Sequence, residues 1–337
     1  MSIVVLKFGG TSVSTEENRE FAFNHVIDEL NNGNNPVVVV SAMGRKGAPY
    51  ATDTLLSLVG NTCDKEAIDL VCSCGELISA CVFADGLNNK GIKAKPFSGI
   101  TAGVVTDENH GNSEIISMNT SNVLKAIDEG FVPVITGFQG QSVSGRITTL
   151  GRGGSDTSAV EIGGYLGADC VDIYTDVPGI AITDPRIVAD AMFVEKISAD
   201  DILLLAENGA SVIHPRAVAA FKKHNLPILR VRSTFDKGEG TKIVNDFKAE
   251  GLVGIAVIKG LTESDDGAVS VCGRRYTKSD DGDIAAITVL DYKPGDIESI
   301  SMIDVISCCK SKNLFQFTTS MFSMNRKVNE IYESCAK

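Results

Sequence analysis

Residues 3–12, IVVLKFGGTS, join an apolar, β-branched run directly to two glycines. A run that is apolar at successive positions is typical of a strand buried on both faces of a sheet. Lys7 supplies a point charge, and Gly9 and Gly10 let backbone N–H groups approach an anion closely. The stretch predicts a buried strand that ends at a phosphate-binding turn, although it does not match a Walker A loop. On its own, a glycine turn beside a solvated lysine explains it equally well.

Further strand signals alternate with helical ones along the chain. The predicted strands are 36–42, 132–138, 170–176 and 226–233, and the predicted helices are 14–30 and 119–130. Such alternation predicts an α/β fold, in which a mainly parallel sheet is sandwiched between helices. Ligands of open α/β sheets bind beyond the carboxyl ends of the strands. The segments that follow each strand are therefore where a site is expected.

Composition limits the class of protein. With 337 residues, 43% of them hydrophobic, the chain can form one large α/β domain and a smaller one. The formal net charge of -12 argues against a nucleic acid or an anionic membrane as partner, so a small ligand is expected. The nine cysteines lack the spacing of a zinc site and are expected to be free thiols. Without a run of about 20 apolar residues, a cytoplasmic protein is expected.

The segments after the predicted strands hold several candidate ligand contacts. Thr52 stands at a predicted helix start in the loop 41–56, where it could bind a ligand or cap the helix. Glu76 lies among apolar residues, and a buried carboxylate there needs a partner, either a structural cation or a substrate ammonium.

The segment 151–159, GRGGSDTSA, is the second glycine-rich stretch. Arg152 could hold a carboxylate with its planar guanidinium, and Ser155 adds a hydroxyl at a helix N-terminus. Glycines at 151, 153 and 154 would let a ligand lie against the main chain. Together with Lys7 and its glycines, the segment indicates a ligand that carries a carboxylate and receives or donates phosphate.

At these residues the sequence resembles the aspartokinases of the amino-acid kinase superfamily. The resemblance runs in order over residues 2–245, through VLKFGGTS, SAMG followed by TD, GE, GRGGSDTSA, YTDVPGI, TDPRIV and IHPRAV. The loop 41–56 is similar to that of Bacillus-type enzymes. The resemblance implies the amino-acid kinase fold and the ATP-dependent phosphorylation of L-aspartate, with Mg²⁺ carried by ATP rather than held at a separate protein metal site.

The resemblance also implies a role for each matching residue. Lys7 and Asp156 would be catalytic, Lys7 at the transferring phosphoryl group and Asp156 organising the catalytic cations. The implied ATP-binding residues are Lys7, Phe8, Gly9, Gly10, Thr175, Asp176, Ala181, Arg186 and Ser211. The implied aspartate-binding residues are Thr52, Glu76, Arg152, Gly153, Gly154 and Ser155. A structural ion pair is the alternative for Arg186, and His214 is expected to be structural.

Two departures from the family pattern leave alternatives open. Ser211 stands where the family usually has lysine, which favours a weakly active enzyme or a regulatory paralogue. Another amino-acid or carboxylate kinase, such as a glutamate kinase, is a further alternative. Residues 1–245 are expected to form the catalytic domain, and the resemblance implies a homodimer or higher homo-oligomer.

The second departure is the short C-terminal region, which is expected to form one reduced, α+β, ACT-like domain at residues 250–337. Its predicted strands are 252–261, 284–292 and 313–322, its predicted helices are 297–312 and 325–336, and its predicted exposed turns are 262–269 and 276–283.

Overall fold

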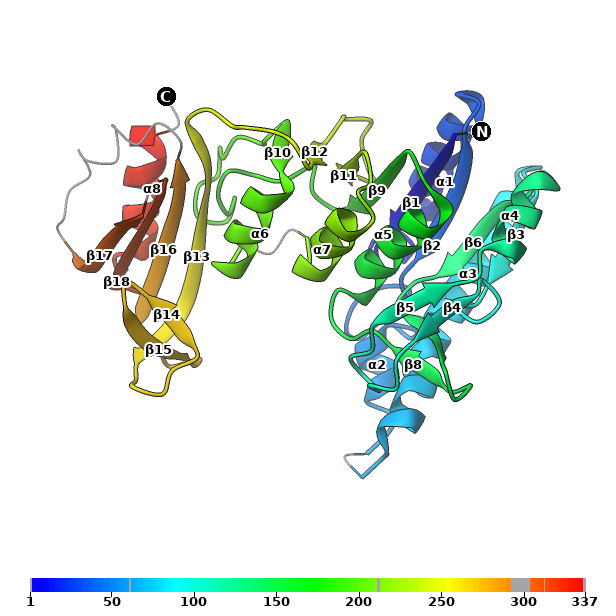
Figure 1. Ribbon diagram of the computed structural model, residues 1–337, viewed down its shortest axis with the longest axis horizontal. Helices are drawn as coiled ribbons and strands as arrows, with labels where there is room; N and C mark the ends of the chain where they lie inside the picture. The colour runs from blue at the N-terminus through cyan, green and yellow to red at the C-terminus, as the bar shows by residue number, and fades with distance from the viewer. Residues whose placement is uncertain (1, 61, 211–212, 292–303, 312, 336–337) are drawn as a thin grey trace. The chain divides into compact units, whose positions relative to one another are not determined.

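The structure is a computed structural model that describes residues 2–60, 62–210, 213–291, 304–311 and 313–335 (Figure 1). Its internal contacts divide the chain into two compact units. The first comprises Met1–Gly179 and Ile213–Ile243, and the second comprises Ile180–Val212 and Val244–Lys337. Packing therefore groups residues 180–212 with the C-terminal part, whereas the order of motifs groups them with residues 1–245. The functional division at residues 245–250 remains a prediction.

A mainly parallel sheet forms the centre of the first unit, as the strand and helix alternation predicts. Within this unit the strands run in the order β12-β11-β9-β1-β2-β6-β3, and only β12 pairs antiparallel to its neighbour. Their bounds are β1 Ile3–Phe8, β2 Asn35–Val40, β3 Ala94–Phe97, β6 Val132–Thr136, β9 Cys170–Thr175, β11 Leu229–Ser233 and β12 Thr241–Val244.

Helices cover both faces of this sheet. On β1, Val4, Leu6 and Phe8 belong to the core that also holds buried residues of α1 (Glu16–Asn31) and α3 (Lys65–Asn89). Strand side chains alternate between faces, so Val5 and Lys7 point the other way. There α5 (Gly154–Leu166) packs on β1 and β9, beside α7 (Pro215–Lys223) (Figure 1). The alternation thus directs Lys7 toward α5.

The helix α3 is long and apolar enough to cross a bilayer by length and composition alone. It packs against β3, β6 and β8, and its buried residues include two carboxylates, Asp69 and Glu76. Both carboxyl groups are buried in the protein interior, which is the pattern of a core helix.

The remaining elements of the first unit lead into the glycine-rich segment. A small sheet has the strand order β5-β4-β7-β8. Its last strand, β8, is followed after two residues by the turn that begins at Arg152. The bounds are β4 Val104–Thr106, β5 Ile115–Met118, β7 Gln139–Ser142, β8 Ile147–Thr149, α2 Thr52–Leu56 and α4 Ser121–Asp128.

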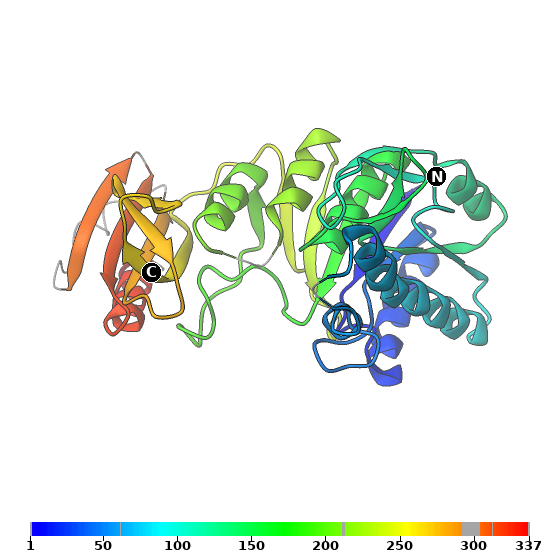
Figure 2. The same cartoon turned by 90° about the horizontal axis from the view of Figure 1, so that it is seen from below.

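The second unit is built on an antiparallel sheet, with α8 packed against it (Figure 2). Its strand order is β14-β15-β13-β16-β18-β17, and the bounds are β13 Leu252–Glu263, β14 Val269–Val271, β15 Arg274–Lys278, β16 Ile284–Asp291, β17 Val305–Ser311 and β18 Leu314–Ser320. The other elements are β10 Lys196–Ser198, α6 Ala199–Glu207 and α8 Met324–Cys335.

Most C-terminal predictions agree with these elements, but the helix predicted over 297–312 does not. Its described part, 304–311, contains β17, which pairs antiparallel with β18; residues 297–303 and 312 lie outside the described residues. Short apolar runs fit a helix or a strand equally well by periodicity. Pairing at the sheet edge decides between them here. The predicted turns are shorter than expected because β13, β14 and β15 extend into them.

Candidate active site

Strand register aligns the carboxyl ends of the central strands. Phe8, the last residue of β1, pairs with Val40 at the end of β2 and with Tyr174 on β9. The N–H of Gly137, just after β6, donates to the carbonyl of Val40 at 3.0 Å. The segments that follow these strands therefore begin in one row, where a ligand of an open α/β sheet is expected.

An ion pair lies at the centre of this edge. The Nζ of Lys7 is 2.6 Å from Oδ1 of Asp156, and the two side chains are only 10% and 18% exposed. Asp156 belongs to the first turn of α5, where the helix dipole favours a negative charge. A Cβ added at Gly9 would stand 3.5 Å from Nζ of Lys7. The main chain at Gly9 thus lies close to the ammonium group.

Gly10 closes the same turn against the loop that follows β2. A Cβ at Gly10 would stand 2.5 Å from the carbonyl oxygen of Gly44 and 2.9 Å from that of Ala42, closer than any side chain tolerates. The N–H of Gly44 donates to the carbonyl of Gly10 at 2.9 Å. The two loops therefore hold each other in place through their backbones.

Glu76 lies directly beneath this loop and is 2% exposed. The N–H of Ala42 donates to Oε1 of Glu76 at 3.0 Å, and Oε2 has no hydrogen-bond partner among the described residues. Burial raises the pKa of Glu76 to about 8, which the hydrogen bond from Ala42 only partly offsets. A cation that reached Oε2 would restore the charged form. This is the behaviour expected of a carboxylate that receives an ammonium group.

Thr52 begins the helix α2, which packs against α3. The N-cap of α2 is Ala51, without a side-chain cap. The capping alternative for Thr52 is therefore wrong, and its hydroxyl remains a candidate ligand contact.

The glycine-rich loop after β8 requires its glycines. Gly151 and Gly153 have φ values of 72° and 70°, and a Cβ on Gly153 would stand 2.2 Å from Cγ of His214. Gly154 is buried. Ser155 packs closely on Gly137, because a Cβ added at Gly137 would stand 2.9 Å from the Cβ of Ser155. Arg152 is exposed at the tip of this loop. The loop thus presents a guanidinium and a helix N-terminus from a tightly packed base.

His214 is part of that base. It is the N-cap of α7, and its Nδ1 accepts a hydrogen bond from the N–H of Arg216 at 3.3 Å. Burial and the nearby guanidinium groups of Arg216 and Arg152 lower the pKa of His214. A neutral, capping imidazole agrees with the structural role predicted for it.

Arg45 is a residue of this edge that sequence reasoning missed. It comes from the loop after β2, and its Nη2 lies 2.8 Å from Oδ2 of Asp176 while its Nε donates to Oγ1 of Thr11 at 2.9 Å. Thr175 donates its hydroxyl to Oδ1 of Asp176 at 3.1 Å. The loops after β1, β2 and β9 thus meet at one guanidinium. Nothing in the sequence distinguishes Arg45 from an ordinary surface arginine.

A second missed group supports the glycine-rich loop from below. Asp69, fully buried on α3, accepts hydrogen bonds from Thr149 Oγ1 and from the N–H of Gly111 (3.2 Å), and pairs with Nδ1 of His110 (2.7 Å). Arg216 donates to the carbonyl of Leu150 at 2.5 Å. Asp69 lies seven residues before Glu76, two turns along the same face of α3. Like Glu76, Asp69 is a carboxylate among apolar residues, so the same sequence signal marks it.

The remaining predicted site residues are Phe8, Ala181, Arg186 and Ser211. The side chain of Phe8 is fully buried and stacks on Phe83 and Tyr174, so only its main chain could meet a ligand. Ala181 and Arg186 belong to the second unit. Arg186 pairs with Asp184, its Nη2 2.7 Å from Oδ2, which lowers the pKa of Asp184; this is the ion pair held as the alternative. Ser211 lies outside the described residues.

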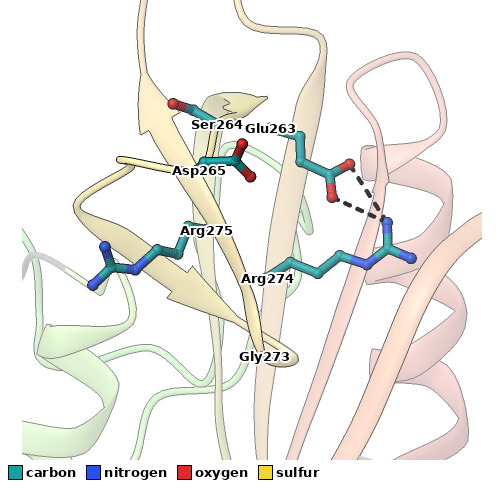
Figure 3. Close-up of a pocket in the computed structure, with 6 residues that line it drawn as sticks. All are labelled: Glu263, Ser264, Asp265, Gly273, Arg274 and Arg275. Atoms are coloured by element: carbon teal, nitrogen blue, oxygen red, sulfur yellow. Dashed lines mark hydrogen bonds and ion pairs between the residues drawn. The ribbon is translucent and has the colours of Figure 1, made fainter.

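The second unit contains a pocket of about 350 Å³ that none of the predicted site residues lines. Figure 3 shows the guanidinium of Arg274 against the carboxylate of Glu263, while Arg275 extends in the other direction. Nη1 of Arg274 lies 3.3 Å from Oε1 and 3.4 Å from Oε2 of Glu263. Its remaining lining residues are Ser264, Asp265 and Gly273. It lies beside the turn between β14 and β15 and shares no residue with the edge described above.

Comparison with known proteins places this arrangement in a family. The profile of the amino acid kinase family matches residues 2–229. Aspartokinase from Geobacillus stearothermophilus is 44% identical over 253 residues, covering 74% of this chain and 61% of the relative; aspartokinase 1 from Bacillus subtilis is 42% identical over 276 residues, covering 78% and 68%.

Among solved structures, E. coli aspartokinase III, crystallised with aspartate and ADP, superposes with a TM-score of 0.80 at 20% identity and covers 100% of each chain. This likeness shows the fold. The chain spans about three fifths to two thirds of the length of the Geobacillus and Bacillus aspartokinases. The chain belongs to the amino acid kinase family, among its aspartokinases.

Proposed function

We propose that this protein transfers the γ-phosphoryl group of ATP to the side-chain carboxylate of L-aspartate, giving 4-phospho-L-aspartate and ADP. The observation that carries the proposal is the Lys7–Asp156 pair at the carboxyl edge of the sheet, flanked by two glycine-rich turns. The aspartokinase names of its relatives, and the aspartate and ADP in the E. coli structure, support the choice of substrates. The reaction would open the aspartate-family route to lysine, threonine, methionine and diaminopimelate.

Aspartate would be held by groups of complementary charge. Glu76, whose Oε2 has no hydrogen-bond partner among the described residues, would receive the substrate ammonium. Arg152 would hold a carboxylate with its planar guanidinium. Thr52 and Ser155 would add hydroxyl contacts, and Gly153 and Gly154 would let the substrate lie against the main chain at the α5 N-terminus.

The chemistry needs no activating base. A carboxylate has a pKa near 4 and is already a nucleophile at neutral pH. Its oxygen would attack the γ-phosphorus in line, a C–O–P bond would form, and the bond to the β,γ-bridging oxygen would break as ADP leaves. Lys7 and the backbone N–H groups of Gly9 and Gly10 would stabilise the charge on the transferring phosphoryl group.

Mg²⁺ fits this edge as a companion of ATP. No cluster of three or more metal-ligating side chains occurs among the described residues. Mg²⁺ commonly binds through one or two carboxylates together with substrate phosphates, and Asp156 offers such a carboxylate. Bound there, the ion would neutralise phosphate charge. Thr175 and Asp176 would line the nucleotide site.

The C-terminal antiparallel sheet with its helix α8 supports the proposal of a reduced ACT-like domain. We further propose a cytoplasmic homodimer or higher homo-oligomer, which size-exclusion chromatography with light scattering tests directly.

ADP release with a panel of acceptors tests the proposed function. We expect ADP formation that depends on L-aspartate and exceeds that with L-glutamate, L-asparagine or no acceptor. Glutamate dependence would identify another carboxylate kinase. ATP binding without turnover on any acceptor would identify the regulatory paralogue, which Ser211 in place of the usual lysine favours.

A further inference from the structure

Arg45 occupies an unusual position for a surface arginine. Its guanidinium bridges Thr11, one residue beyond the glycine turn of Lys7, and Asp176, one residue beyond Thr175. Both contacts lie within the first unit. The guanidinium therefore lies between the turn assigned to the transferring phosphoryl group and the pair assigned to the nucleotide.

The contact to Asp176 can be exchanged at little cost. The side chain of Arg45 is 73% exposed and that of Asp176 is 43% exposed. Ion pairs between exposed groups contribute little to stability, because water solvates both partners well when they separate. A ligand of greater negative charge can therefore replace the carboxylate.

A polyphosphate is the ligand that suits this guanidinium. Arginine binds phosphate oxygens through two parallel N–H groups, the same geometry that it uses toward a carboxylate. The carboxylate of Asp176 thus stands where a phosphate could be held. The main chain of Gly44, next to Arg45, is held to the glycine turn by the hydrogen bond from its N–H to the carbonyl of Gly10.

We propose that Arg45 is a phosphate-binding residue that exchanges Asp176 for the polyphosphate of ATP when the nucleotide binds. The inference rests on the proposed function for the identity of the nucleotide. It adds a second cation, from the loop after β2, to the one that Lys7 supplies.

Direct titration of the purified chain with ATP, ADP and AMP in the presence of Mg²⁺ tests this role. The variants are Arg45→Ala and Arg45→Lys, and Lys46→Ala is the matched control, since it removes the same charge from the next, exposed position of the loop. Thermal unfolding of each variant verifies that the fold is intact.

We expect Arg45→Ala to weaken ATP binding about tenfold or more, ADP binding less, and AMP binding hardly at all, because the lost contact is to the distal phosphates. Arg45→Lys should retain part of the affinity through its charge, and Lys46→Ala should bind all three like the unaltered chain. Equal weakening for the three nucleotides would mean that Arg45 only ties loops together. Unchanged ATP affinity would also overturn the proposal.

These binding measurements need no turnover. A chain that binds ATP through Arg45 but does not phosphorylate aspartate would disprove the proposed function and leave this inference standing.

Discussion

The buried carboxyl group of Glu76 makes the stability of the fold depend on pH. Burial raises its pKa to about 8, so the folded protein holds a proton that the unfolded chain releases near pH 4.5. Between these values the folded state binds more protons than the unfolded state. The contribution of Glu76 to stability is therefore fully present below about pH 4.5 and is lost as the pH rises toward 8.

Replacing this carboxyl by an amide should remove that loss. In Glu76→Gln, the amide oxygen can still accept from Ala42. We expect the free energy of unfolding of the unaltered chain to fall relative to the variant by up to about 1.4 kcal/mol per pH unit between pH 5 and 8. Urea unfolding at a series of pH values measures this difference. If the difference in unfolding free energy between the two chains does not change with pH, Glu76 does not titrate in this window. Glu16→Gln, at an exposed glutamate, serves as the control.

Arg152 is expected to act on the acceptor rather than on the nucleotide. Lysine keeps the charge but cannot form two parallel N–H contacts to a carboxylate, so Arg152→Lys should raise the aspartate KM about tenfold or more and the ATP KM far less. Steady-state kinetics with each substrate varied in turn measures both constants. Equal rises in the two constants would contradict the assignment.

At the scale of elements, α3 supports the site through a buried carboxylate. Asp69 ties α3 to His110 and to Thr149 at the end of β8, just before the glycine-rich loop. Removing it leaves buried polar partners without a hydrogen bond, and each such group costs roughly 1–3 kcal/mol.

Asp69→Ala should therefore lower the free energy of unfolding by about 3 kcal/mol and raise the aspartate KM, because the base of the Arg152 loop loosens. Asp85→Ala, at an exposed position of the same helix, should change stability by less than about 0.5 kcal/mol. Chemical denaturation of both variants makes the comparison. Similar small losses in the two would show that the Asp69 contacts contribute little.

Elements with strong local patterns were predictable from sequence. The strand of residues 3–8 is apolar at every position except Lys7, and its observed bounds are Ile3–Phe8. The helix predicted over 297–312 was wrong for residues 305–311, since pairing with β18 is a long-range contact that no local pattern reveals. Arg45 was missed for a similar reason, because its partners Thr11 and Asp176 lie 34 and 131 residues away. The family resemblance named Lys7 and Asp156 as catalytic residues, but no local pattern predicts the ion pair between them.

At the scale of the whole molecule, the chain forms two compact units, and the Lys7–Asp156 pair lies in the first. The order of motifs predicted one division near residue 245. In the structure the chain passes from one unit to the other at residues 179–180, 212–213 and 243–244. A linear sequence does not show that a segment inside a motif-rich region packs with a distant one. The described contacts of Lys7, Glu76 and Asp156 all fall within the first unit.

We propose that this edge of the sheet makes an acyl phosphate of aspartate, with Lys7 at the transferring group. The most direct measurement is hydroxylamine trapping, which converts an acyl phosphate to a hydroxamate, in the unaltered chain and in a folded Lys7→Ala variant. We predict aspartate β-hydroxamate equal to the ADP released, and a kcat about 10²–10³-fold lower in the variant. ADP release without hydroxamate would exclude an acyl phosphate product, and a folded Lys7→Ala variant with near-normal kcat would exclude Lys7 from the transfer.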